Sequence, residues 1–267
     1  MIKTSRFLIL FSCVVAFCFW LGSCTNPMPA KAVSLNFAST PPYRDVLIEL
    51  ERQYRQEKFN VTINYTFSGA TALRDRIEQG ESFDIFLVTS NLVIDDLQKK
   101  GLLLEETIKN LVSTQMVLIV PADSSLAIGD FKDLTSDRIK TIAMGTQRLG
   151  VGQHTKEILT NLGIFQQVQS KAVWANVESR EITKAVESKQ ADVGITFLPE
   201  AKSSKKLKTA AIAPTDSHKP IFARLAVLKN SQNPVEAKEF IEFLTSSKAM
   251  SIFEKYGFTA ISPSSKS

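Results

Sequence analysis

The feature that most constrains the fold of this chain is the alternation of short apolar runs with amphipathic stretches of helical spacing. In one such stretch, Tyr43, Val46, Leu47, Leu50 and Tyr54 repeat at helical spacing, as the residues of one helix face do. Alternating strands and helices predict an α/β protein with mostly parallel sheets. The expected strands cover residues 34–38, 61–67, 83–88, 116–120, 140–144, 171–174, 192–197, 208–213 and 222–228.

One local pattern recurs within this alternation: an apolar strand ends, a few small residues follow, and a helix begins. The backbone N–H groups of a first helical turn have no partner inside the helix, and the helix dipole adds partial positive charge there. Small residues let an anion approach these groups, so the pattern predicts an anion site made by the backbone. Capping alone also favours small residues at such corners. The pattern occurs in residues 36–47, 67–77, 142–159 and 173–186.

The N-terminal residues indicate export. Lys3 and Arg6 precede an apolar run over residues 7–21, which is shorter than the roughly 20 residues of a membrane-spanning helix and typical of a signal peptide. The run ends in "LGSC", where small residues before Cys24 indicate a lipoprotein cleavage site. We expect a signal peptide over residues 1–23, lipid on Cys24 and a tether over residues 24–33; an uncleaved anchor is the alternative. The folded part then lies outside the cytoplasmic membrane, on its outer face or in the periplasm.

Composition narrows the classes of function. Without the signal peptide only Cys24 remains of three cysteines, so no disulfide is expected. Loss of Lys3 and Arg6 lowers the formal charge from +5 to +3, and no basic–aromatic stripe suggests a nucleic-acid partner. The two histidines, His154 and His218, have no neighbour at metal-ligand spacing. We therefore expect no metal site and no cofactor.

Two common catalytic signatures are also missing from the sequence. The glycine-rich residues 145–152 lack the Gly-Lys-Ser/Thr ending of a phosphate-binding loop. No Gly-x-Ser-x-Gly nucleophile elbow occurs either. The sequence therefore favours a binding protein over an enzyme.

Seven segments, taken in order, resemble the substrate-binding proteins of ABC transporters, most closely the molybdate-binding branch. They are "FAST", "TFSGATALRDRIEQG", "FDIFLVTSNLVIDDLQKKGLL", "MVLIVPADS", "GQHTKEILTNLG", "NVESREITKAVESKQADVGITF" and "AVLKNSQNPVEAKEFIEFLTSSKAMSIFEKYGF", within residues 34–258. The resemblance implies a type II periplasmic-binding-protein fold, with two α/β lobes joined by hinge strands. It places lobe 1 at residues 34–117 and 224–262, lobe 2 at residues 118–223, and an oxyanion in the cleft between them.

Transferring the family's site residue by residue exposes departures. The family's first serine falls at Thr40 or Pro41, and its second falls at Ala70, where the hydroxyl is lost. The family's tyrosine falls at Phe197, a second lost hydroxyl, and each loss costs roughly 1.5–3 kcal/mol unless another donor replaces it. Pro41 and Pro42 lack N–H groups. The ligand-binding positions implied are Ser39, Thr40, Ala70, Thr71, Val151, Val177 and Phe197, with Ser68 and Arg148 as accessory residues and the two valines acting through their backbones.

The resemblance implies a monomeric receptor that captures a molybdate- or tungstate-like oxyanion and delivers it to a membrane permease with a cytoplasmic ATPase. A receptor for phosphate, sulfate or an organic acid is an alternative. A periplasmic enzyme on the same architecture would require a cluster of titratable residues in the cleft, which the implied positions do not contain. A sensor or adhesion module without a permease is a further alternative that the sequence does not separate from the receptor.

Overall fold

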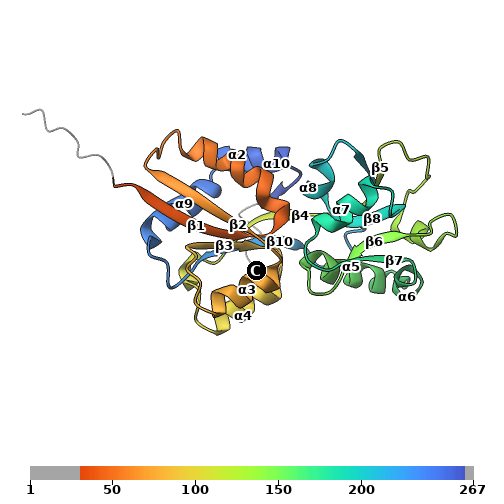
Figure 1. Ribbon diagram of the computed structural model, residues 1–267, viewed down its shortest axis with the longest axis horizontal. Helices are drawn as coiled ribbons and strands as arrows, with labels where there is room; N and C mark the ends of the chain where they lie inside the picture. Colours follow the sequence, from red (N-terminus) through yellow and green to blue (C-terminus); the bar gives the residue numbers. More distant parts are fainter. Residues whose placement is uncertain (1–30, 262–267) are drawn as a thin grey trace, which may run out of the picture. The chain divides into compact units, whose positions relative to one another are not determined.

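The computed structural model describes residues 31–261, which contain two sheets with helices packed on their faces (Figure 1). The expected signal peptide, the lipid-bearing Cys24 and most of the expected tether lie outside the described residues. A six-stranded sheet has the order β11-β4-β10-β3-β1-β2, and a five-stranded sheet has the order β7-β6-β8-β5-β9. The strands are β1 (Val33–Ser39), β2 (Val61–Phe67), β3 (Ile85–Val88), β4 (Lys109–Thr114), β5 (Met116–Pro121), β6 (Ile142–Gly145), β7 (Ala172–Ala175), β8 (Val193–Phe197), β9 (Leu207–Ile212), β10 (Ile221–Val227) and β11 (Thr259–Ala260).

Helices cover the sheets from both sides. Side chains of α2, α9 and α10 share one core cluster with β1, β2 and β10, whereas those of α3 and α4 form a second cluster with β3. In Figure 1 these two groups lie on opposite faces of the six-stranded sheet. The helices are η1 (Pro41–Tyr43), α2 (Arg44–Tyr54), α3 (Ala70–Glu78), α4 (Asn91–Lys99), η2 (Glu105–Thr107), η3 (Phe131–Thr135), α5 (Gly150–Asn161), α6 (Phe165–Gln169), α7 (Arg180–Glu187), α8 (Leu198–Lys202), α9 (Pro234–Leu244) and α10 (Ser247–Lys255).

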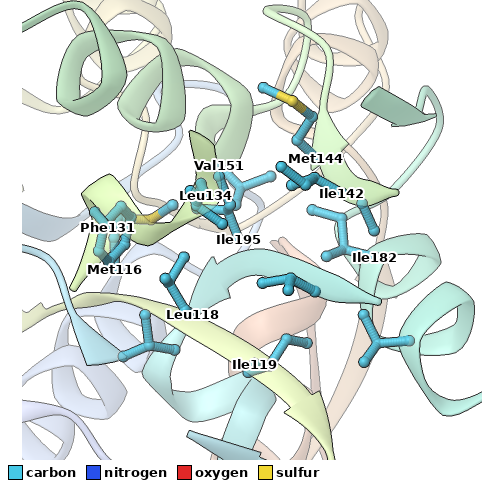
Figure 2. Packing of buried hydrophobic residues seen from close by; sticks show 14 of the residues in the cluster. Met116, Leu118, Ile119, Phe131, Leu134, Ile142, Met144, Val151, Ile182 and Ile195 are labelled. Atoms are coloured by element: carbon cyan, nitrogen blue, oxygen red, sulfur yellow. The ribbon is translucent and has the colours of Figure 1, made fainter. Parts of the chain in front are cut away.

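The five-stranded sheet has its own core. Met116, Leu118 and Ile119 of β5 pack with Ile195 of β8 and with Val151 of α5, all at most 1% exposed (Figure 2). This cluster is separate from the two clusters of the six-stranded sheet. Each sheet therefore buries its own apolar faces and forms its own lobe.

All nine expected strands form, but the expectation of mostly parallel sheets is wrong. Within residues 31–261, β1 pairs in parallel with β2 and β3, and β6 pairs in parallel with β7 and β8. The other five pairings, all made by β5 or by β4 and β10, are antiparallel. Strands that carry the chain between the sheets run against their neighbours, and local hydrophobic patterns do not encode this direction.

The chain passes between the two sheets twice. The first passage is at Gln115, because β4 ends at Thr114 and β5 begins at Met116. Met116 and Val117 already pair with β8 in the five-stranded sheet. The return passage lies in residues 213–220, because Ile221 pairs with Thr114 of the six-stranded sheet. The pairing of the strands thus moves from one sheet to the other two to three residues before the lobe boundaries expected at 117/118 and 223/224. Those boundaries remain a prediction.

Candidate functional site

A small cavity lies between the two lobes, and it is lined by residues from both. Its volume is about 20 Å³, counted as the room open to the centre of a water molecule. A single water needs about 10–15 Å³ on this measure, so the space between the lobes is close to the size of one water molecule. Its walls are Thr40, Pro41, Pro42, Gly69, Ala70, Thr89, Leu149, Gly150, Val151, Glu178, Ser179 and Phe197.

Three helices begin at this cavity. The first hydrogen bonds of the helical turns are from Leu73 N–H to Gly69 O in α3 (3.0 Å), from Gly152 N–H to Leu149 O in α5 (3.0 Å), and from Glu181 N–H to Glu178 O at α7 (3.2 Å). The N–H groups before these bonds have no acceptor within their own helix. The expected convergence of helix starts on one pocket is therefore present for α3, α5 and α7.

The close fit between β6 and α5 explains why the α5 corner contains glycines. A Cβ atom added at Gly152 would lie 2.1 Å from the carbonyl oxygen of Thr146 and 2.4 Å from that of Gly145. These distances are far below van der Waals contact, so only glycine fits at position 152. The glycine-rich residues 145–152 thus bring the start of α5, including Gly150 and Val151, to the cavity wall.

Three hydroxyl-bearing residues line the cavity, and two of them were not expected from the sequence. Thr40 was expected; it is 8% exposed, and its hydroxyl has no hydrogen-bond partner among the described residues. Thr89, which is 5% exposed, follows β3, and Ser179, which is 7% exposed, precedes α7. The segment "FLVTSN", a strand followed by small polar residues and a helix, carries the signal that would have identified Thr89.

The remaining expected residues fall into two groups. Ala70, Val151 and Phe197 line the cavity. By contrast, Ser39 does not reach the wall, because its hydroxyl donates to the carbonyl of Leu87 at 3.0 Å. The accessory candidates Ser68 and Arg148 are not among the wall residues, and neither is Thr71. The hydroxyl of Thr71 instead donates to the carbonyl oxygen of Arg148, at 3.0 Å.

Val177 does not lie at the cavity, and its N–H is committed elsewhere. Its side chain is 70% exposed, and its N–H donates to Oε1 of Glu181 at 3.2 Å. The same carboxylate accepts the N–H groups of Asn176 and Glu178, at 2.8 and 3.4 Å. The fourth corner therefore meets the cavity one to two residues later than expected, at Glu178 and Ser179.

Two carboxyl groups lie at or beside the cavity, which the sequence analysis did not anticipate. Glu178 lines it and forms an ion pair with Lys184 at 3.6 Å. Glu200, 3% exposed, accepts hydrogen bonds from the hydroxyls of Ser179 and Thr196, each at 2.6 Å. Burial raises the pKa of Glu200 above its ordinary value, and the two hydroxyls oppose that shift.

Tyr43 of η1 is fully buried near the same wall. Burial raises the pKa of its phenol well above the ordinary value; the Thr89 hydroxyl lowers it, and the charge of Glu200 raises it further. The phenol oxygen nevertheless has no partner in good hydrogen-bond geometry among the described residues. Tyr43 thus brings lobe 1 close to the Glu200 carboxyl without bonding to it.

The described part of the chain contains neither a group of side chains suited to a metal ion nor a helix suited to crossing a membrane. His154, whose ring centre is 6.2 Å from that of Phe197, is largely buried, and burial lowers its pKa. Within residues 31–261 no group of three or more His, Cys, Asp or Glu side chains could hold a metal ion. Nor does that part contain a helix with the length and apolar character needed to cross a membrane.

Two α/β lobes joined by hinge strands, with a small cavity between them, define the class of type II periplasmic binding proteins. The fold matches a periplasmic molybdate-binding protein of Azotobacter vinelandii with a TM-score of 0.76 and 17% identity, over 85% of this chain and 100% of that one. The chain belongs to the bacterial extracellular solute-binding protein family, whose model matches residues 35–259.

More similar relatives agree with that assignment. A Bacillus subtilis protein named as the ABC transporter substrate-binding lipoprotein YvgL is 30% identical over 96% of this chain and 98% of its own length. The molybdate-binding protein ModA of Haemophilus influenzae is 29% identical over 81% and 86% of the two chains. A solved structure from Clostridium difficile, described as the substrate-binding domain of a molybdenum ABC transporter, has 31% identity and a TM-score of 0.71, over 86% of this chain and 100% of that one.

Proposed function

We propose that this protein is an exported, lipid-anchored receptor of an ABC transporter that captures one small oxyanion in the cavity between its lobes. Lipid on Cys24 would hold it at the outer face of the cytoplasmic membrane, and the closed receptor would dock on a permease driven by a cytoplasmic ATPase. The anion serves as cargo, so the function requires no catalytic residue, cofactor or resident metal. A monomer suffices for it, because the cavity walls come from a single chain.

The observation that carries the proposal is the Thr40 hydroxyl. It is buried at the cavity wall and has no hydrogen-bond partner among the described residues. Leaving a buried hydroxyl unpaired costs about 1–3 kcal/mol, and a bound oxyanion would accept a hydrogen bond from it. The starts of α3, α5 and α7 at the same cavity add backbone donors and partial positive charge.

Molybdate or tungstate is the first candidate for the cargo, supported by the names of the relatives. Two hydroxyls that the family pattern carries are missing at Ala70 and Phe197. Thr89 and Ser179 bring two other hydroxyls to the same wall, and the hydroxyl of Ser179 already donates to Glu200 at 2.6 Å. Because specificity depends on where donors lie, phosphate, sulfate and small organic acids remain candidates for the test.

Calorimetric titration of the mature protein with molybdate, tungstate, sulfate and phosphate tests the proposal. We expect one anion to bind at one site per chain and to raise the melting temperature, because a ligand that binds only the folded state stabilises it. Absence of heat and of any thermal shift with all four anions would contradict an oxyanion receptor.

Thr40→Val removes the hydroxyl from the cavity while keeping the shape of the side chain. A hydrogen bond to a charged group is worth about 1.5–3 kcal/mol, so we expect about 10- to 150-fold weaker binding. Thr114→Val is the matched control: this hydroxyl is also buried and without a partner among the described residues, but it does not line the cavity. Equal losses of affinity in the two variants would show that the Thr40 hydroxyl does not contact the anion.

A further inference from the structure

A buried carboxyl group lies directly behind one wall of the cavity, and the proposed function does not use it. Glu200 of α8 accepts a hydrogen bond from Ser179 Oγ on one carboxyl oxygen and from Thr196 Oγ1 on the other, both at 2.6 Å. Ser179 lines the cavity, whereas Thr196 does not. The protonation state of Glu200 therefore affects the direction of the Ser179 hydroxyl, and Ser179 faces the cavity.

A serine hydroxyl has a single proton to donate. While Glu200 is ionised it can only accept, so the Ser179 proton points to Glu200 and only lone pairs of Ser179 face the cavity. A fully ionised oxyanion also presents only lone pairs, and the two oxygens would face each other without a proton between them. If Glu200 carries a proton on Oε1, it donates to Ser179 Oγ, and the Ser179 hydroxyl turns to donate to the anion.

We propose that Glu200, acting through Ser179, makes the cavity bind an oxyanion together with one proton. A fully ionised anion such as molybdate or sulfate binds with a proton taken up by Glu200. An anion that carries its own hydroxyl, such as hydrogen phosphate, donates that proton to Ser179 and leaves Glu200 ionised. Glu200 is a positioning residue in this scheme, which rests on the proposed function.

The charged groups around Glu200 do not neutralise it directly. Arg180 of α7 lowers the pKa of Glu200, but it is a smaller influence than burial, and Arg180 is paired with Asp45 at 3.3 Å. The charge of Glu178 raises the pKa of Glu200. Tyr43 of η1 faces the same carboxyl. Strands β5 and β8 contain no titratable side chain, and Lys208, the single titratable residue of β9, bonds to the carbonyl of Ser124 at 2.8 Å. Burial remains the largest influence on Glu200 and favours its protonated form.

The test is calorimetric titration with molybdate and with sulfate between pH 6 and pH 9, in two buffers that differ in ionisation enthalpy and are not oxyanions. We expect uptake of about one proton per bound anion wherever Glu200 is ionised in the free protein, and a Kd that rises about tenfold per pH unit there. A constant Kd with no proton uptake overturns the proposal and leaves the receptor function intact. No binding of any anion at any pH overturns both.

Glu200→Gln separates the proton from the structural role, because the amide donates to Ser179 as a protonated carboxyl would. We expect this variant to bind molybdate with the same Kd across the pH range and without proton uptake. Glu187→Gln at the far end of α7 removes a carboxylate that does not line the cavity and leaves the Ser179–Glu200 bond in place, so it should keep the wild-type pH slope. Loss of the slope in both variants would overturn the proposal.

Ser179→Ala provides a second variant should Glu200→Gln fail to fold. It keeps the backbone at the start of α7 and removes the connection between Glu200 and the anion. We expect weaker binding at pH 6 and a flat pH profile. A wild-type slope in Ser179→Ala would show that the proton is taken up elsewhere, and this result too would overturn the proposal.

Discussion

At the scale of the residue, buried polar groups decide what the cavity can bind. Thr40 has an unpaired hydroxyl at the wall, whereas the hydroxyl of Ser39, its neighbour in sequence, is already bonded to the Leu87 carbonyl. Sequence alone does not distinguish these two hydroxyls, because the difference lies in which strand neighbour each one meets. Ala70, Val151 and Phe197 reach the wall as expected because each stands at or beside the start of a helix.

The raised pKa of Glu200 predicts a specific dependence of stability on pH. A carboxyl whose pKa is higher in the folded state than in the unfolded state contributes stability that is complete below the ordinary pKa, and this contribution is lost as pH rises through the folded-state value. Burial is the largest cause of the shift. Glu200→Gln has no charge to bury, so its stability relative to the wild-type protein should increase from pH 4 to pH 8.

Urea unfolding of the ligand-free proteins at several pH values measures this difference. Glu187→Gln is the control, because Glu187 is partly exposed at the far end of α7, whereas Glu200 is buried. A stability difference between Glu200→Gln and wild type that stays constant or falls as pH rises would show that Glu200 is not destabilised by ionisation in the folded state.

At the scale of the element, the loop before α7 shows how hydrogen bonds to one carboxylate move a binding position. Glu181 lies in the first turn of α7, and its carboxylate accepts the N–H groups of Asn176, Val177 and Glu178. These bonds withdraw the Val177 amide from any ligand and leave Glu178 and Ser179 as the residues of this corner that reach the cavity. The sequence reveals a corner at this place but not its internal hydrogen bonds, which explains the displacement of one to two residues.

Glu181→Ala should destabilise the protein by about 1–2 kcal/mol, because it removes the acceptor of three backbone N–H groups and each hydrogen bond contributes about 0.5–1.5 kcal/mol. Glu187→Ala at the other end of α7 is the matched control, and it should change stability by less than about 0.5 kcal/mol. Chemical unfolding of the two variants at one pH gives the comparison. Similar stabilities of the Glu181→Ala and Glu187→Ala variants would mean that the Glu181 carboxylate does not hold the N–H groups of residues 176–178 in solution.

The elements that the sequence did not predict are those whose formation depends on distant partners. The strand β4, "KNLVST", has few apolar residues of its own and pairs with β10, which lies about a hundred residues later. The strand β11 is two residues long and forms only against β4. The nine expected strands, by contrast, have apolar runs that a local pattern reveals. Strand direction was mispredicted for the same reason that β4 was missed, since both depend on how the chain passes between the sheets.

At the scale of the whole molecule, the two lobes make direct contact beside the cavity. Thr71 of lobe 1 donates to the Arg148 carbonyl of lobe 2, and Asp45 pairs with Arg180 at 3.3 Å. The ion pair is partly exposed, which limits its contribution to roughly 1 kcal/mol or less. Closure of the lobes around an anion would therefore depend mainly on the ligand and on close packing at the rim.

Gly69→Ala tests that packing. The φ and ψ angles of Gly69 are −63° and 144°, which alanine adopts without strain, but an added Cβ would lie 3.1 Å from the Val177 carbonyl oxygen of the other lobe. Because overpacking costs about 1–3 kcal/mol, we expect at least about fivefold weaker binding at the lower end of this range, with little change in the stability of the ligand-free protein.

Calorimetry and small-angle scattering with and without the anion measure affinity and closure in this variant. Gly129→Ala is the control, because no atom lies within 4 Å of the Cβ position there. Wild-type affinity in Gly69→Ala would indicate that the bound protein does not bring Gly69 and Val177 together.

The bond between Thr71 and position 148 uses the main-chain oxygen of Arg148 and not its side chain. A substitution at position 148 that keeps the backbone conformation therefore leaves this hydrogen bond in place. The exposed side chain at position 148 can therefore vary while the contact between the two lobes at Thr71 is kept.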